Sequence, residues 1–305
     1  MLPFRAVRPF ASSMLAATAL LTCLAAPAAA QDPADPNPGA ITVSGGLDFT
    51  NAYMFRGIKQ ESDGLIMQPY LDLGVTLFTG EGSLRTFGIN VGTWNSLHGF
   101  NDTGTNNDRN RKLWYESDFY TSLNFGLTGG VTAAVTYTAY TSPNDAFTSV
   151  KEVAFKLSVD DSMQLGKFSL KPYGIIASEM DTATHSGQAD GGLEAGTYVE
   201  LGIAPSYAWP RFSLSVPVKV GLSLSNYYED PITNNDSSFG YGSAAGIVTY
   251  PLSAKPTKYG SWNLHGGVEY QRLGSAAQTI LNEFKDNGEA KGYKFVYSFG
   301  LGFTY

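Results

Sequence analysis

The last fourteen residues of the chain, GYKFVYSFGLGFTY (292–305), decide the fold. Successive side chains of a β-strand point to opposite faces, so alternate residues of this stretch share a face. One face is large and apolar and consists of Tyr293, Phe295, Tyr297, Phe299, Leu301, Phe303 and Tyr305. The other face is mostly small or polar and consists of Lys294, Val296, Ser298, Gly300, Gly302 and Thr304. Helical spacing gives no such division, so the stretch is predicted to be a strand with one face toward apolar surroundings.

The same two-residue period runs back along the chain to Ile41. It is clear in FSLSVPVKVGLSLS (212–225) and in VTAAVTYTAY (131–140), and less regular at 167–180 and 239–251. Turn signals between the periodic segments predict twelve strands, at 41–55, 65–78, 84–98, 113–128, 131–142, 151–160, 167–180, 194–208, 212–227, 239–251, 259–274 and 292–305. Such strands exceed the usual five or six residues of a soluble sheet and suit a tilted membrane crossing of about ten.

The connections between these strands alternate in length. Short ones are predicted at 79–83, 129–130 and 209–211, and longer ones at 99–112, 181–193, 228–238 and 275–291. Connections of intermediate length are predicted at 56–64, 143–150, 161–166 and 252–258. Outer-membrane barrels have short periplasmic turns, longer outer loops and an even strand count. A sheet edge is unstable in hydrocarbon, so spanning strands must close on themselves. The sequence therefore predicts an all-β fold, a transmembrane antiparallel up-and-down β-barrel of about twelve strands, in preference to a secreted β-sandwich.

The composition agrees with this fold class. Charged residues make up 15% of the 305 residues, below the roughly 25% of an average soluble protein. Hydrophobic residues make up 43%, which is too many for a disordered chain. After the N-terminus, however, no apolar run approaches the roughly 20 residues of a membrane-spanning helix. These values argue against a cytosolic α/β enzyme and leave a secreted or membrane β protein.

The N-terminal segment is predicted to direct export. Arg5 and Arg8 precede a short apolar core, and three alanines (28–30) supply a cleavage site, so residues 1–30 are expected to be a signal peptide. Residues 31–40 are expected to form a periplasmic tail, and 41–305 the barrel in the cell outer membrane. Cys23, the one cysteine, lies in the signal peptide, so the mature chain offers no disulfide or thiolate. Without the two arginines, the mature chain has 18 basic and 27 acidic residues. Its net charge of −9 disfavours nucleic acid as a partner.

Two stretches carry a resemblance to a known family. They are GGLDFTNAYMFRGIKQESDG (45–64) and FGINVGTWNS (87–96). They resemble the TorF-like, or Gcw-type, family of proteobacterial outer-membrane porins, in which Tyr-x-x-Arg-Gly-Ile/Val on an early strand is followed by Gly-x-Trp-x-Ser. The matching residues are Tyr53, Phe55, Arg56, Gly57 and Ile58 for the first motif and Gly92, Trp94 and Ser96 for the second. The resemblance covers about fifty residues and implies an outer-membrane barrel that acts as a pore.

Charged residues opposite the apolar faces are the candidates for a functional lumen. They are Asp48, Asp72, Glu116, Asp118, Glu152, Lys156, Lys171, Glu200, Lys219 and Glu269, together with His265. Charges in a water-filled barrel set its ion preference, and the excess of carboxylates predicts a modest preference for cations. Alternatively, these charges pair across the lumen and brace a sealed barrel, since twelve strands fall between a packed barrel of eight and an open one of sixteen.

The sequence predicts neither a cofactor, a metal site nor a catalytic residue. None of the three histidines, His98, His185 and His265, has a second ligand at a spacing that shares its face. An outer-membrane lipid hydrolase would need a serine and a histidine together on the lipid-facing side, whereas His265 falls on the lumen face. The polar loop 101–112 is expected to hold solvated turns rather than calcium.

One loop and the last strand carry further expectations. Ala277, Ile280, Leu281 and Phe284 are at helical spacing within 276–291, which predicts a short helix at the rim or over the mouth. In the last strand, Tyr297, Phe299, Leu301, Phe303 and Tyr305 are expected to face lipid, with the terminal aromatic recognised by the barrel-assembly machinery.

Three functions remain open at this point. The favoured one is a pore for small solutes or ions. The others are a structural or adhesive barrel with binding loops and, less favoured, a lipid hydrolase. The oligomeric state is not predicted.

Overall fold

The computed structural model describes residues 39–61, 64–98, 113–180, 194–230, 232–253, 258–285 and 288–305. The expected signal peptide, most of the tail, the loop 101–112 and His185 lie outside these ranges. None of the described helices is long and apolar enough to cross a membrane.

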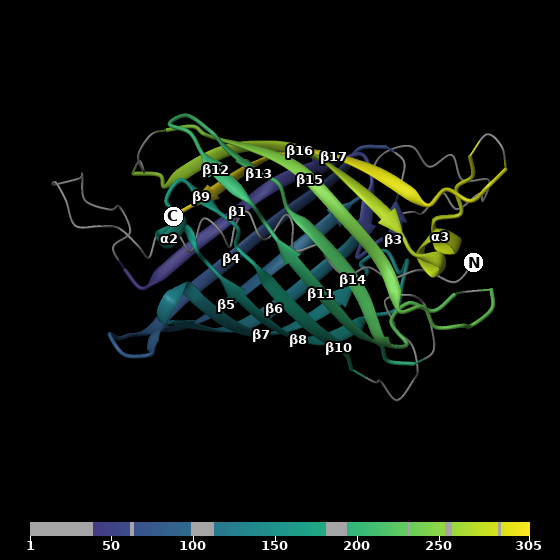
Figure 1. Ribbon diagram of the computed structural model, residues 1–305, viewed down its shortest axis with the longest axis horizontal. Helices are drawn as coiled ribbons and strands as arrows, with labels where there is room; N and C mark the ends of the chain where they lie inside the picture. Colours follow the sequence, from purple (N-terminus) through teal and green to yellow (C-terminus); the bar gives the residue numbers. More distant parts are fainter. Residues whose placement is uncertain are drawn as a thin grey trace.

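Twelve antiparallel strands form a closed ring (Figure 1). They are β1 (Ile41–Thr50), β4 (Ile66–Thr79), β5 (Leu84–Leu97), β6 (Trp114–Leu127), β7 (Val131–Thr141), β8 (Val150–Val159), β10 (Tyr173–Glu179), β11 (Thr197–Ile203), β14 (Val218–Ser225), β15 (Phe239–Pro251), β16 (Ser261–Leu273) and β17 (Tyr293–Thr304). Each strand pairs with its neighbours in sequence, and β17 pairs with β1, so that Leu301 lies opposite Leu47. The predicted fold class, a transmembrane antiparallel barrel of about twelve strands, is confirmed.

The two ends of the barrel differ in their connections. We name as the short-turn end the one where β1 begins and β17 ends; it carries the turn 80–83 and the single helical turn η1 (Thr128–Gly130). The opposite, long-loop end carries the connections 51–65, 98–113, 180–196, 226–238 and 274–292, and the shorter connection 142–149. The predicted alternation of short and long connections is therefore present in the fold. In outer-membrane barrels the short turns lie on the periplasmic side.

Three neighbouring strands are interrupted by proline near the short-turn end. β9 (Phe168–Ser169) precedes β10, β12 (Ser206–Ala208) follows β11, and β13 (Ser213–Ser215) precedes β14. The breaks contain Pro172, Pro205 and Pro217, which have no N–H to give to the ladder. Their carbonyl oxygens still accept hydrogen bonds from the backbone N–H groups of Val159, Val216 and Ala245. The prediction of unbroken strands at 167–180, 194–208 and 212–227 is thus corrected.

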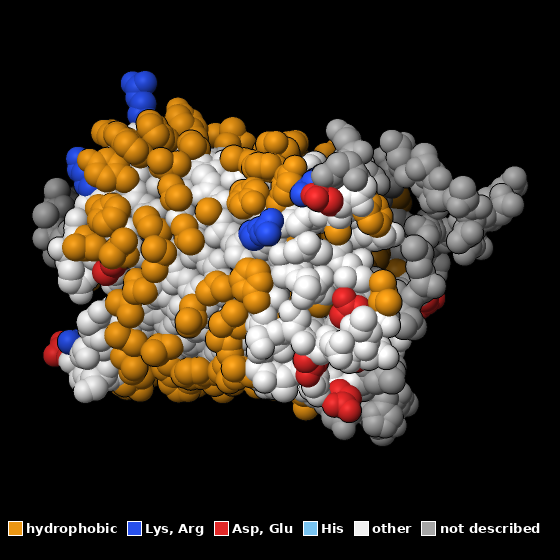
Figure 2. Space-filling view, turned by 45° about the vertical axis from the view of Figure 1, so that its right-hand side comes forward, with side chains coloured by type: hydrophobic (Ala, Val, Ile, Leu, Met, Phe, Trp, Pro, Cys, Tyr) orange, Lys and Arg blue, Asp and Glu red, His pale blue; other side chains and the backbone are white. Residues whose placement is uncertain are grey.

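The exterior is apolar, as a wall in contact with lipid requires. Leu71, Phe119 and Phe155 are among many large apolar side chains that are exposed. Figure 2 shows hydrophobic side chains as a broad belt on one face of the molecule, beside a right-hand region with scattered carboxylates. On β17, Tyr297 and Phe299 are 57% and 58% exposed.

Inward-facing tyrosines lie over glycines of the adjacent strand. A Cβ atom at Gly46 would meet the phenol end of Tyr70, and one at Gly92 would overlap that of Tyr120. Tyr241 lies in the same way over Gly221. Because glycine has no side chain, each ring can lie against the wall instead of standing up into the lumen.

A short hairpin fills the lumen at the long-loop end. β2 (Tyr53–Phe55) and β3 (Ile58–Glu61) form a separate two-stranded sheet, which we call the plug hairpin (Tyr53–Glu61). Both residues of its turn have positive φ, 44° at Arg56 and 79° at Gly57, as a tight two-residue hairpin requires. Phe55 and Ile58 are 0% exposed.

The predictions of a wall strand at 41–55 and of a loop at 56–64 are therefore wrong. The wall strand ends at Thr50, and the chain turns into the barrel. The alternation of apolar residues continues through Phe55, so sequence period alone did not show where the chain leaves the wall.

Candidate functional site

A cavity of about 1240 Å³ lies inside the barrel toward the short-turn end, against one side of the wall. It is lined by inward residues of β1 and β4 to β8, and by connecting residues of the short-turn end, including α2 (Ser162–Leu165). The deeper lining includes Trp94 and Tyr140, which belong to the apolar core around the plug hairpin. The cavity therefore reaches from the short-turn end to the plug.

A hydrogen-bonded array runs across three strands of the cavity wall, β4, β5 and β6. Asp72 on β4 accepts a hydrogen bond from Asn90 Nδ2 at 2.5 Å and one from the Tyr120 hydroxyl at 2.9 Å. Asn124 on β6 donates to Asn90 Oδ1 at 3.0 Å. Its own side-chain oxygen accepts from the hydroxyl of Ser122 at 3.3 Å. The array places amide and hydroxyl groups side by side on a wall that faces the cavity.

Arg56, in the turn of the plug hairpin, makes several contacts with the surrounding barrel. Its guanidinium contacts both carboxylate oxygens of Glu152, at 2.8 and 3.0 Å, and donates to the Tyr227 hydroxyl at 2.8 Å. It also lies 3.9 Å from the ring centroid of Tyr198, while the Tyr228 hydroxyl donates to the Arg56 carbonyl. Arg56 and Glu152 are 3% and 2% exposed. Removing one member of such a buried pair leaves a charge without compensation.

A second buried carboxylate lies close to this contact. Glu200 on β11 accepts hydrogen bonds from the hydroxyls of Tyr173, Tyr198 and Tyr241 at 2.7, 2.5 and 2.7 Å. Tyr198 also stacks beneath Arg56, so the two clusters share a ring. Hydroxyl donors satisfy the Glu200 oxygens that burial removes from water.

A helix closes over the plug from the long-loop end. α3 (Ser275–Leu281) has buried Ala277, Ile280 and Leu281, and the Lys59 ammonium of β3 donates to the Leu281 carbonyl at 2.7 Å. The predicted short helix is confirmed. It ends at Asn282, whose φ of 50° turns the chain, so Phe284 lies beyond it and is exposed.

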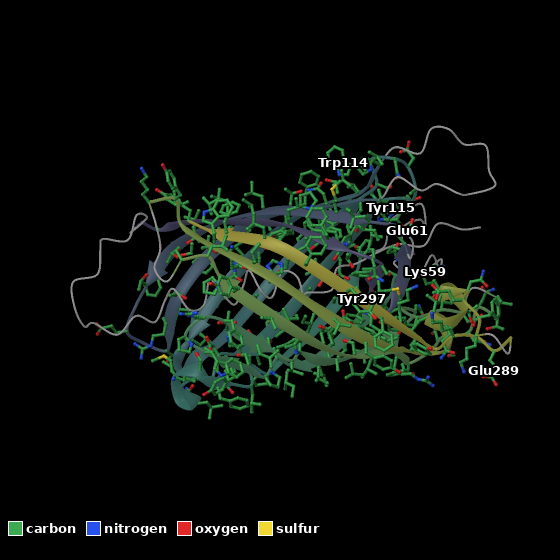
Figure 3. The ribbon with its side chains drawn as sticks, turned by 90° about the horizontal axis from the view of Figure 1, so that it is seen from above. Lys59, Glu61, Trp114, Tyr115, Glu289 and Tyr297 are labelled. Atoms are coloured by element: carbon green, nitrogen blue, oxygen red, sulfur yellow. The ribbon has the colours of Figure 1, made fainter. Side chains whose placement is uncertain are left out.

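The rim around the helix is stabilised by charged and aromatic contacts. Although burial opposes it, hydrogen bonds from Lys294 and Lys291 lower the pKa of Glu283. Burial lowers the pKa of His98 to about 3, so its ring is neutral where it stacks on Tyr115. Figure 3 shows Tyr115 toward the same end as Lys59 and Glu61 of the plug hairpin, with Tyr297 nearer the middle.

The structure divides the predicted lumen residues into separate groups. Asp72 and Lys156 line the cavity. Glu116, Asp118, Glu152 and Glu200 are 0–2% exposed and lie in the plugged half, where Glu116 and Asp118 are beside Tyr53 of the plug. The remaining candidates do not border the cavity: Asp48 contacts His265 at 2.7 Å, Lys219 lies 3.9 Å from Glu269, and Lys171 is in the break between β9 and β10. Most of the carboxylates therefore do not line the open part of the lumen.

The plug hairpin and the contacts of Arg56 were not predicted from the sequence. The signal was present in the motif that carried the family resemblance, since Arg56 and Gly57 form a two-residue turn between the paired apolar residues Phe55 and Ile58. His265, which faces inward, contacts Asp48 and Asn263. Among the described residues, no three histidine, cysteine, aspartate or glutamate side chains gather as a metal site.

Closed strand pairing, an apolar exterior and an internal hairpin define a transmembrane β-barrel with a plug. No protein-family model and no curated protein matches the sequence.

Several solved structures are similar to the chain in fold. An outer-membrane channel from Pseudomonas putida F1 is 11% identical over 90% of this chain and 100% of that one, with a TM-score of 0.49. The NanC porin is 10% identical over 87% of this chain and 99% of its own, with a TM-score of 0.43. The outer-membrane phospholipase A from Escherichia coli is 12% identical over 90% and 94%, also with a TM-score of 0.43. Likeness at this level assigns no function.

Proposed function

We propose that the protein is an outer-membrane pore for small solutes or ions, closed on one side by the plug hairpin. The observation that carries this proposal is the division of the lumen. Toward the short-turn end it holds a cavity of about 1240 Å³, and toward the long-loop end it is filled by a hairpin that contacts the wall through hydrogen bonds, rings and one ion pair. All of these contacts are non-covalent, so the hairpin can leave without breaking the wall.

The proposed orientation places the short-turn end in the periplasm and the plug toward the outside. It is supported by the loop lengths and by the signal peptide expected at 1–30. Outer-membrane lipid and the barrel-assembly machinery are the proposed partners during insertion. The mature protein should fractionate with the outer membrane and migrate differently on gels before and after heating; recovery in the soluble periplasm would contradict the proposal.

The proposed open state has a modest preference for cations. If the plug hairpin leaves, Glu116, Asp118, Glu152 and Glu200 would border the passage. Arg56, which neutralises Glu152 in the closed state, would leave with the hairpin. Carboxylates around a narrow passage attract cations and repel anions. This preference therefore belongs to the open state and not to the cavity itself.

A sealed structural barrel is the second candidate, because the plug hairpin and α3 are packed into one apolar core. Single-channel recording in planar bilayers separates the two. The comparison uses the mature protein, a variant with residues 52–61 replaced by a short Gly-Ser linker, and Arg56→Met. We expect rare, small openings for the parent protein, frequent openings for Arg56→Met and a large steady conductance for the plug replacement.

The matched control is Lys285→Met, which removes a cation from an exposed pair with Glu289 at the same end of the barrel. It should conduct as the parent protein does. A folded plug replacement that never conducts would overturn the pore and support the sealed barrel.

A further inference from the structure

We infer that the cavity binds a neutral, polyhydroxylated solute of sugar size on the wall formed by β4, β5, β6 and β7. This inference rests on the proposed pore, because it names the class of solute that the pore would carry. It follows from three features of the cavity, namely its hydrogen-bonding groups, its balance of charge and its aromatic surfaces.

Apart from Asp72 and Arg85, the hydrogen-bonding side chains of this wall are neutral amides and hydroxyls. Asn124 bonds to Asn90 at 3.0 Å, and Thr136 on β7 donates to Ser122 at 2.9 Å. All four side chains line the cavity. Amides and hydroxyls both donate and accept hydrogen bonds, whereas carboxylates only accept and ammonium groups only donate. Such a wall complements a ligand whose own groups also do both, which is the property of neighbouring hydroxyls.

The charges around the cavity favour neither a cation nor an anion. Among the described residues of its lining, the charged ones are Asp72, Asp160, Arg85 and Lys156, two of each sign. The carboxylate of Asp72 already accepts hydrogen bonds from Asn90 and Tyr120, one at each oxygen. An ionic ligand would lose hydration without meeting a net opposite charge. A neutral ligand avoids this cost.

Aromatic surfaces lie beside the polar array. The rings of Tyr70 and Tyr120 lie over Gly46 and Gly92 of the adjacent strands and line the cavity. A ring against the wall offers an apolar surface, while its hydroxyl provides a polar edge. A sugar ring has the matching form, with C–H groups on its faces and hydroxyls around its edge. A wall that combines aromatic rings with amides and hydroxyls selects against purely apolar and purely ionic solutes.

The cavity is also large enough and placed for access from the short-turn end. Its volume of about 1240 Å³ exceeds the ~300–1,000 Å³ of pockets that hold one drug-sized ligand. Gln164 of α2 and Gly129 of η1 are part of its lining at that end. The plug closes the other end, so a solute bound in this state would be held between the plug and the short turns.

Calorimetric titration of the full mature protein in detergent tests the inference without requiring conductance. The probes are glucose and maltose, with gluconate and glucosamine as charged analogues of glucose. We expect saturable binding of at least one neutral sugar and at least tenfold weaker binding of the charged analogues. Asn124→Leu should weaken binding of the neutral sugar at least fivefold, since a net hydrogen bond contributes about 1 kcal/mol.

Thr136→Val, which keeps the shape of the side chain, provides a second variant should Asn124→Leu fail to fold. Asn263→Leu is the control, because this inward asparagine on β16 contacts His265 and does not line the cavity. Equal binding by all three variants, tighter binding of a charged analogue, or no binding by the parent protein would overturn the inference. If the protein conducts but binds no sugar, only the inference of a sugar site is overturned. If it binds a sugar but no variant conducts, only the proposed pore is overturned.

Discussion

Arg56 is the residue that connects the turn of the plug hairpin to the barrel wall. It sits at the turn of the plug hairpin and joins β2 and β3 to the walls β8 and β11 and to the loop that follows β14. An arginine suits this place because its planar group contacts two carboxylate oxygens and a ring at once, which lysine cannot do. The hairpin therefore depends on one buried ion pair as well as on apolar packing.

Arg56→Met should destabilise the folded barrel by about 3–5 kcal/mol, because Glu152 stays buried without its partner. Replacing both residues, as in Arg56→Met with Glu152→Met, should recover most of this loss, since an apolar pair of similar volume avoids the burial of charge. Urea titration of the refolded protein measures both variants. An equal loss of unfolding free energy in the single and double variants would contradict the role of the ion pair.

A substitution at Phe299 tests which face of the last strand contacts lipid. Phe299 is exposed near the middle of β17, where it stacks on Phe49 at 4.9 Å between ring centroids. Phe299→Arg should cost about 2–4 kcal/mol, and Phe303→Arg, nearer the strand end, should cost less. Insertion into vesicles, followed by heat-dependent migration on gels, measures the difference. Insertion of Phe299→Arg as efficient as the parent's would show that this face does not meet lipid.

At the scale of elements, the inner wall is shaped by pairs of tyrosine and glycine on adjacent strands. Tyr120 can reach Asp72, two strands away, because Gly92 between them has no side chain. The same arrangement at Tyr70 keeps that ring against the wall. The cavity exists because these rings do not stand upright in it.

Gly92→Ala should therefore lower stability by about 1–3 kcal/mol, since its methyl group would overlap the phenol of Tyr120. It should also displace Tyr120 from Asp72. Gly246→Ala on β15 is the matched control, because nothing lies within 4 Å of the added carbon there. The midpoint of urea unfolding measures the effect. A Gly92→Ala protein as stable as Gly246→Ala would mean that the ring moves away at no cost.

At the scale of the whole molecule, the barrel combines an open half and a packed half. The apolar core lies inside the ring at the long-loop end, and the apolar exterior faces lipid. Ions could pass through such a lumen only if the plug hairpin left the apolar core. Selectivity for ions would therefore be a property of the state without the plug.

Neutralising Glu116 and Asp118 together, as Gln and Asn, should shift the reversal potential toward anions in a salt gradient. The measurement belongs in the plug-replacement variant, where these carboxylates would border the passage. The shift should shrink as ionic strength rises, because salt screens the charges. An unchanged reversal potential in a conducting channel would place the two residues outside the pathway.

The sequence alone determined the fold class, the membrane setting and the alternation of short and long connections. Each follows from a local rule, because side chains on a strand alternate between faces and hydrocarbon tolerates no unpaired backbone. β17 shows this best, since Tyr297 and Phe299 are exposed on the face that the period of its sequence assigned to lipid. The helix at 275–281 was also predictable, from the spacing of Ala277, Ile280 and Leu281.

Only the tertiary structure decided what fills the lumen. Tyr53 and Phe55 continue the alternation of β1, yet they leave the wall, because burial inside the ring satisfies them as well as lipid would. The polar contacts that hold the turn of this hairpin, at Arg56, come from residues about 100 and 170 positions away, namely Glu152, Tyr227 and Tyr228. Likewise, Asp72 and Glu116 share the lumen-facing period, but one lines a cavity and the other lies against the plug. A two-residue period records which face a side chain takes, and it carries no information about what lies opposite that face.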